Sequence, residues 1–348
     1  MVSYLRVQLV LSARLGRTLT VKGTCAMKSE PGLHISVSAH RSHRADAFTL
    51  VELLVVVAVI AMLVAILLPA LHSTRHSAQS VKSLGNMRQI AVGWMVYANE
   101  SDNMIVPGQP GRYPQNEKNL YDVGNGRHYR PRWFALMGSK AGFFAYNNPS
   151  TDIADEHRYP VDNEIFRCPV VPEWISTRNF PYGYNYQFLG NARFLNDDPA
   201  AGKFVNFPVR VHEIQNFTGT VMFASCMGTA AGKPEKLRTP NRPDGSRDPA
   251  LCAMGGHGYA LDPPRLIPEG DFADPQNPGM QHRSAPDPRY AGGKANVVFC
   301  DGHCDPMTLE EMGYVVDDDG SVAGTHEDAT NQLFSGDSTD KDVPKVNR

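Results

Sequence analysis

A single carboxylate, Glu52, stands at the start of the most apolar stretch of this sequence. Residues 53–71 follow it without any charge. Inserting a carboxylate into lipid costs a few kcal/mol, so a charged group here should have a partner or a task. The alternative is a residue that lies at the depth of the lipid headgroups, where its charge is cheap.

A second group of reactive side chains lies near the other end of the chain. Cys300, His303 and Cys304 come close to the spacing of zinc ligands. However, neighbouring side chains of a hairpin point to opposite faces, so the two cysteines need not converge. No second Cys/His pair has zinc spacing, so we favour a hairpin turn at Asp301, Gly302 and His303 over a metal site.

Signatures of known catalytic sites are missing from the sequence. It has no nucleophile elbow, no zinc-protease helix, no phosphate-binding loop and no complete dinucleotide fingerprint. Residues 317–320, Asp-Asp-Asp-Gly, could bind Ca²⁺ loosely but lack the rest of an EF-hand loop. We therefore expect no enzyme and no cofactor, with calcium as the one open possibility.

Composition limits the classes of partner. The net charge is −2 and the pI is about 6.6. Nucleic-acid-binding proteins usually carry basic patches, so nucleic acid is not an expected partner.

The apolar stretch predicts a membrane helix within residues 48–71. Nineteen uncharged residues, 53–71, rise roughly 30 Å as a helix, the thickness of the hydrocarbon core of a bilayer. A buried helix of a soluble domain would normally show a polar stripe over this length. None is present here.

The residues around Glu52 resemble the processing site of type IV prepilins and type II secretion pseudopilins. The matching segment is residues 47–54, Ala-Phe-Thr-Leu-Val-Glu-Leu-Leu. The resemblance implies that prepilin peptidase cuts between Ala47 and Phe48, and that Phe48 is then N-methylated. It also implies that Glu52 is neutralised by the terminal ammonium of a neighbouring subunit, and that Pro69 kinks the helix. Ala47 departs from the glycine that usually precedes the cut.

Residues 1–47 then form a leader. They contain seven Lys or Arg residues against two acidic residues, a surplus that keeps a segment in the cytoplasm. The apolar stretch is too long for the core of a secretory signal peptide. Met27 is an alternative start, which would shorten the leader. Removing the leader discards Cys25 and leaves five cysteines, so at least one has no partner within the chain.

The helix should continue beyond the membrane through residues 72–100. An apolar face recurs every three or four residues, at Leu84, Met87, Ala91, Trp94 and Ala98. Lys82, Arg88 and Gln89 lie off that face. We predict one helix over residues 48–98, bent near Pro69, whose second half packs on a soluble domain.

Residues 101–316 predict a loop-rich soluble α+β domain with an antiparallel sheet. Residues 220–225 and 295–300 have the apolar, turn-bounded pattern of strands. Asp301-Gly302 predicts a type I′ turn, which needs a positive φ at both central residues.

Two further segments of this region are predicted to lack packed structure. Residues 234–288 contain eleven prolines and predict an extended surface loop. Residues 317–348 are acidic and poor in apolar residues, which predicts a disordered tail.

Asp301, Gly302 and His303 also resemble the C-terminal signature of a prepilin-like subgroup in which a His precedes Asp-Gly by nine residues. Ala291 occupies the position of that His here, with Tyr290 beside it and His282 further upstream.

The resemblance implies a structural role: a pilin-like subunit of a type II secretion-like pseudopilus or a pilus-like filament. Its partners would be prepilin peptidase, other pilin-like subunits, an inner-membrane secretion or assembly platform, and the lipid bilayer. The chain would cross the inner membrane once, with its C-terminal domain in the periplasm. The alternative is a membrane-anchored envelope protein that binds carbohydrate or an exported substrate through its long loops.

Overall fold

The structure is a computed structural model of the full chain. It describes residues 5–13, 17–25, 49–108, 121–124, 127–129, 132–147, 161–174, 180–190, 192–194, 204–206, 208–238, 256–266, 283–322 and 326–344. The chain forms two compact units, Met1–Ala61 and Met62–Arg348.

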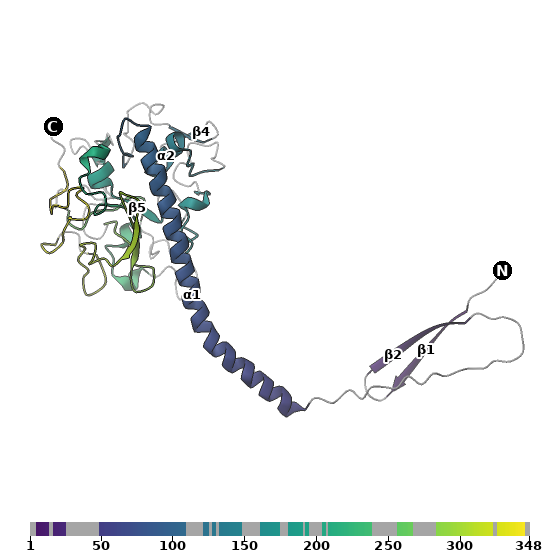
Figure 1. The fold of residues 1–348 in the computed structure, drawn as a ribbon. Helices are drawn as coiled ribbons and strands as arrows, with labels where there is room; N and C mark the ends of the chain where they lie inside the picture. Colours follow the sequence, from purple (N-terminus) through teal and green to yellow (C-terminus); the bar gives the residue numbers. More distant parts are fainter. Residues whose placement is uncertain are drawn as a thin grey trace, which may run out of the picture. The chain divides into compact units, whose positions relative to one another are not determined.

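The predicted single helix is confirmed. Helix α1 spans Leu50–Asn99 and continues through Pro69, which lies inside it. It ends one residue after the predicted boundary, where Ser101 and Asn103 both donate backbone N–H groups to the carbonyl of Ala98. Figure 1 shows the second half of α1 lying along the folded domain.

The remaining elements are short. Helix α2 spans Trp133–Ala141. The strands are β1 Leu5–Ala13, β2 Arg17–Cys25, β3 Tyr121–Gly124, β4 Arg127–Tyr129, β5 Tyr182–Tyr184, β6 Ala192–Phe194, β7 Phe204–Asn206, β8 Val221–Ser225, β9 Ala295–Phe299 and β10 Cys304–Met307. Single turns of 3₁₀ helix occur at Glu164–Phe166, Val211–Glu213, Gly228–Ala230 and Glu235–Leu237, and a π-helical turn at Tyr186–Gly190.

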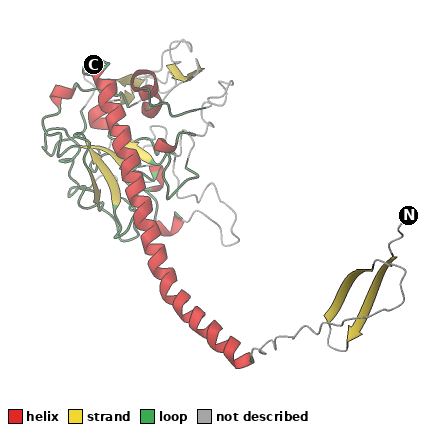
Figure 2. Cartoon of the chain, turned by 45° about the vertical axis from the view of Figure 1, so that its right-hand side comes forward, coloured by secondary structure: helices red, strands yellow, loops and turns green. Residues whose placement is uncertain are grey.

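A four-stranded sheet in the order β10-β9-β8-β5 organises the domain, and every neighbouring pair is antiparallel. The strands predicted at residues 220–225 and 295–300 are its two central strands, β8 and β9. Figure 2 shows these strands beside the second half of α1. The α+β architecture predicted from the sequence is confirmed.

Both faces of the central strands β8 and β9 are buried. On one face, Met222 of β8 and Val298 of β9 join the core cluster that contains Met87 and Trp94 of α1. On the other face, Val221, Ala224, Val297 and Phe299 join a second cluster. A strand that is apolar on both faces needs a covering layer on each side.

The C-terminal segment is part of the second layer, and this corrects the predicted disordered tail. Residues 317–322 and 326–344 are folded, and Phe334 is fully buried against Tyr314. Val322, Ala329 and Val343 are also buried. The segment is poor in apolar residues, but Val322, Phe334 and Val343 belong to the cluster on this second face of β8 and β9, together with residues of other segments such as Leu261 and Leu309.

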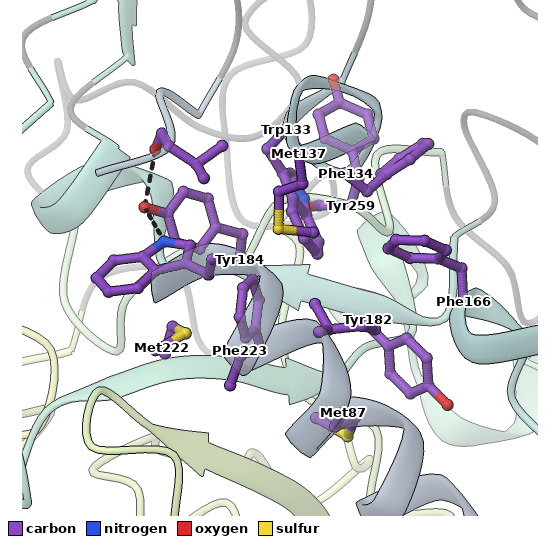
Figure 3. Close-up of a cluster of buried hydrophobic side chains, with 14 of the residues drawn as sticks. Met87, Trp133, Phe134, Met137, Phe166, Tyr182, Tyr184, Met222, Phe223 and Tyr259 are labelled. Carbon is purple, nitrogen blue, oxygen red and sulfur yellow. Dashed lines mark hydrogen bonds between the residues drawn. The ribbon is translucent and has the colours of Figure 1, made fainter. Parts of the chain in front are cut away.

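The face of α1 that packs on the domain is the predicted one. Met87, Ala91, Trp94 and Ala98 are at most 1% exposed, whereas Lys82, Arg88 and Gln89 are exposed. Leu84 is half-buried. Figure 3 shows Met87 near the aromatic side chains of this core, which include Trp133 and Phe134 of α2 and Tyr182 and Tyr184 of β5.

The proline-rich stretch, residues 234–288, is only partly described, and those parts correct the predicted surface loop. Tyr259, Ala260 and Leu261 are buried. Ala260 forms a parallel bridge with Tyr184, so this segment extends the sheet beyond β5. The prolines of this stretch argued against a strand in the sequence. A single short bridge still forms here, because proline is tolerated at the edge of a sheet.

A hairpin that the sequence analysis did not predict lies in the N-terminal unit. Strands β1 and β2 pair in antiparallel register from Leu5↔Cys25 to Ala13↔Arg17. Apolar and polar residues alternate along most of both strands, except at Leu9-Val10-Leu11, and this period is typical of a β-strand.

Candidate functional site

The predicted processing pair, Ala47 and Phe48, lies outside the described residues. The first described residue beyond it is Thr49, directly before α1. The geometry of the site therefore begins with Thr49 and Glu52.

Thr49 and Glu52 form a reciprocal cap at the start of α1. The backbone N–H of Thr49 donates to Oε2 of Glu52 at 2.8 Å, and the Thr49 hydroxyl donates to the same oxygen at 2.7 Å. The backbone N–H of Glu52 donates to Thr49 Oγ1 at 3.2 Å. This is a capping box, which satisfies backbone donors that a helix start leaves free. Both residues are exposed.

Glu52 was predicted from the sequence to be functional, whereas Thr49 was not. The signal that could have revealed it is local, because a Thr three residues before a Glu, ahead of an apolar run, is the capping-box pattern. Glu52 thus has a partner within its own helix.

The apolar half of α1 has no cover within the structure. Its side chains at residues 50–71 are all exposed, from Leu50 at 79% to Val64 at 44%. By length and composition, α1 can cross a membrane, and it is the single helix among the described residues that passes this test. Burying so many apolar side chains requires lipid or other helices.

Beyond the apolar half, one face of α1 also stays open. The exposed residues Val81, Gly85, Arg88, Val92, Met95 and Val96 follow one another at helical spacing, and we call them the outer stripe. Apart from the apolar half of α1 and Met104, the exposed large hydrophobic side chains of the described residues are all on this stripe.

The segment Asp301-Gly302-His303 forms the turn between β9 and β10. Phe299 accepts a bond from the N–H of Gly302 at 2.9 Å and donates to the carbonyl of His303 at 3.0 Å. Gly302 has a φ of +86°, whereas Asp301 is not among the residues with positive φ. The predicted type I′ turn is therefore wrong: Cys300 and Asp301 are the central residues, and Gly302 follows in the left-handed region, the three-residue alternative.

Side chains within this turn stabilise it. Asp301 Oδ1 accepts the backbone N–H of His303 at 3.0 Å and lies 2.6 Å from His303 Nδ1. The His303 ring stacks on Phe299 with 4.3 Å between ring centroids. The Asp, the Gly and the His thus each have a local structural role.

Among the residues that the structure describes, no three His, Cys, Asp or Glu side chains gather closely enough to hold a metal ion. This includes Cys300, His303 and Cys304. Burial raises the pKa of the thiols of Cys300 and Cys304, and a zinc ligand must be a thiolate. Cys168, Cys226, Cys300 and Cys304 are all free thiols.

The acidic segment at residues 317–320 closes a turn with its own side chains. Ser321 donates its hydroxyl to Asp319 at 2.6 Å and lies 3.2 Å from Asp317 Oδ2. Hydrogen bonds from Ser321 lower the pKa of Asp319.

A buried polar cluster beneath α1 was not foreseen. The Tyr290 hydroxyl donates to Ser83 Oγ of α1 at 2.7 Å and lies 3.4 Å from Cys168 Sγ. The hydroxyls of Ser83 and Tyr182 are 3.3 Å apart. Tyr290 is the neighbour of Ala291, where the prepilin-like subgroup has its His, so a tyrosine links this loop to the helix here. Arg289, paired with Asp287 at 2.8 Å, completes the cluster.

Comparison with known protein families gives one match. Residues 42–68 match the model of the prokaryotic N-terminal methylation motif. The matched segment contains Ala47, Phe48, Glu52 and most of the apolar half of α1. No curated protein and no solved structure matches the chain.

Proposed function

We propose that this chain, whose N-terminus is that of a prepilin-type protein, is a structural subunit of a type II secretion-like pseudopilus or a pilus-like filament. The observation that carries the proposal is the methylation motif over residues 42–68, because its members are made to be trimmed and N-methylated. In this proposal prepilin peptidase cleaves between Ala47 and Phe48, and Phe48 becomes the methylated N-terminus. The chain has no catalytic task of its own.

Assembly follows from the exposure of α1. The precursor is held in the inner membrane by the apolar half of α1, with the leader in the cytoplasm and the domain in the periplasm. Leaving lipid for a helix bundle gains little hydrophobic free energy, so side-chain packing and charge pairing must select the partner. Glu52 supplies the charge, and the terminal ammonium of a neighbouring subunit neutralises it.

The outer stripe supports assembly with further copies of this chain. It continues the exposed face of the apolar half without a break, because Ala70, Thr74, Ala78 and Val81 follow at spacings of three and four and are all exposed. Copies that associate through the apolar half in the membrane are thereby brought side by side along the stripe.

The mass of the mature N-terminus tests the proposal. The protein would be isolated from native membranes, and its first residues would be identified by mass spectrometry. We expect a chain that begins at Phe48 with one methyl group on its amine. A protein that keeps residues 1–47, or begins at another residue, would overturn the proposal.

Crosslinking in native membranes then separates the filament subunit from a membrane-anchored binding protein. A photoreactive amino acid in place of Leu63, which is 62% exposed, would report what contacts the apolar half. Contacts with pilin-like chains support the filament and its inner-membrane assembly platform. Monomers that carry bound glycan or exported substrate would favour the binding protein.

A further inference from the structure

The three hydrogen bonds between Thr49 and Glu52 use the two carboxylate oxygens unequally. Both donors of Thr49, the backbone N–H at 2.8 Å and the hydroxyl at 2.7 Å, converge on Oε2. No hydrogen bond from the described residues reaches Oε1. One oxygen is therefore held, and the other remains able to accept.

Holding one oxygen fixes the side chain in advance. A free glutamate loses up to about 2 kcal/mol of side-chain entropy when it is ordered. Two bonds from Thr49 impose that order within the single chain, before any partner arrives. A group that is already oriented binds its partner more tightly because less freedom is lost on binding.

We propose that Thr49 is the positioning residue for Glu52: it holds Oε2 so that Oε1 is presented to the terminal ammonium of a neighbouring copy. This inference rests on the proposed function, because it needs assembly through Glu52. The ammonium and the carboxylate pair as ions, so no proton is transferred.

A purely structural cap makes a different prediction. Thr49 Oγ1 also accepts the backbone N–H of Glu52 at 3.2 Å, and that bond does not involve the Glu52 side chain. If Thr49 only capped the helix, replacing it would weaken the contact between copies by the same factor with or without the Glu52 carboxylate. If Thr49 positions the carboxylate, replacing Thr49 does not weaken this contact any more once the Glu52 carboxylate has been removed.

The test compares Thr49→Val, Thr49→Ser, Glu52→Ala and the double variant Thr49→Val/Glu52→Ala in the full chain. Each carries the photoreactive amino acid at position 63 in native membranes. Crosslinks between copies are measured per molecule of processed protein, because Thr49 lies close to the cleavage site. Thr218→Val is the matched control, since Thr218 is an exposed threonine outside α1 whose hydroxyl donates to the side chain of Asn216 at 3.0 Å.

We expect Glu52→Ala to insert normally and to lose most crosslinks. Thr49→Val should lower the crosslinked fraction by roughly tenfold, in line with the contribution of a hydrogen bond to a charged group. Thr49→Ser, which keeps the hydroxyl, and Thr218→Val should match the wild type. In the Glu52→Ala background, Thr49→Val should not lower the crosslinked fraction any further.

Two results would overturn the role of Thr49 alone. One is a wild-type level of crosslinks in Thr49→Val, and the other is an equal loss with and without the Glu52 carboxylate. If the wild-type chain gave no crosslinks between copies, the proposed function would fail, and the role of Thr49 with it.

Discussion

The indole N–H of Trp94 on α1 donates a hydrogen bond of 3.1 Å to the hydroxyl of Tyr184 on β5, and that hydroxyl donates to the carbonyl of Val106 at 2.9 Å (Figure 3). All three residues are fully buried. Burial raises the pKa of Tyr184 well above its usual value, so the hydroxyl keeps its proton. One hydroxyl therefore ties the helix, the sheet and the chain after the helix together.

Tyr184→Phe should destabilise the domain by about 1–3 kcal/mol, because it leaves a buried N–H and a buried carbonyl without their partner. Urea unfolding of the full chain in detergent, followed by circular dichroism, measures this. Trp94→Phe is the second arm of the experiment. Since both changes break the same bond, the double variant should lose less stability than the sum of the single ones. Strict additivity would contradict the link.

Gly302→Ala should destabilise the β9–β10 hairpin. A Cβ at Gly302 would meet no atom within 4 Å, so the effect comes from the φ of +86° alone. An L-residue in this region costs about 1–2 kcal/mol. The unfolding midpoint in urea should fall accordingly.

Gly85→Ala is the matched control for this change. Gly85 also has open space around it, but it lies inside α1 with ordinary helical φ. Alanine there should stabilise the helix by about 0.5–1 kcal/mol. If both glycine replacements shift the midpoint in the same direction, the backbone explanation of Gly302 is wrong.

Acid should release the C-terminal segment. Arg265 pairs with Asp340 at 2.7 Å and with Asp342 at 3.1 Å, and Lys341 pairs with Asp337 at 2.7 Å. The hydrogen bond from Arg265 lowers the pKa of Asp340. Burial alone would raise the pKa of Asp337. Hydrogen bonds from Lys341 and Thr339 lower this pKa by more than burial raises it, so the pKa is below its usual value.

A carboxyl whose pKa is lower in the folded state stabilises it above its unfolded pKa, and this contribution is lost as the pH falls through the folded pKa. Pepsin should therefore cut residues 326–344 more readily as the pH drops below about 4. The variant Asp337→Asn/Asp340→Asn should show a flatter pH profile. Asp318→Asn, at an exposed position that forms none of these pairs, should keep the wild-type profile. A wild-type pH profile that is no steeper than that of Asp337→Asn/Asp340→Asn would show that these ion pairs do not hold the C-terminal segment.

Local patterns in the sequence were enough to predict α1, its buried face and the strands β8 and β9. The C-terminal cover was missed because average composition hides a few well-placed residues such as Phe334. The hydrogen bonds that hold the segment could not be predicted from the sequence either: Asn331 donates to the carbonyls of Arg265 and Lys341 at 2.8 and 3.0 Å. A clue was present, since an apolar β9 implies layers on both faces.

The residues of the candidate site also fall into those that the sequence predicted and those that it did not. Glu52 was found because its motif is contiguous, and the turn at Asp301 was found because Asp-Gly favours turns. The type of turn was not predicted correctly, because an Asp-Gly dipeptide alone does not determine at which residue β9 ends. Tyr290, Ser83 and Cys168 meet only through the fold, as 207 positions separate Ser83 from Tyr290.

Val92→Arg should impair assembly without affecting the fold. Val92 is 53% exposed in the middle of the outer stripe, so replacing it should change stability by less than about 0.5 kcal/mol. A second cation beside Arg88 would have to be desolvated against the neighbouring copy. Crosslinks between copies, from position 63 in native membranes, should therefore fall. Gln215→Arg adds the same charge at an exposed position outside α1 and should leave them unchanged. Equal losses in both variants would point to net charge, and no loss in either would exclude the stripe from the contact between copies.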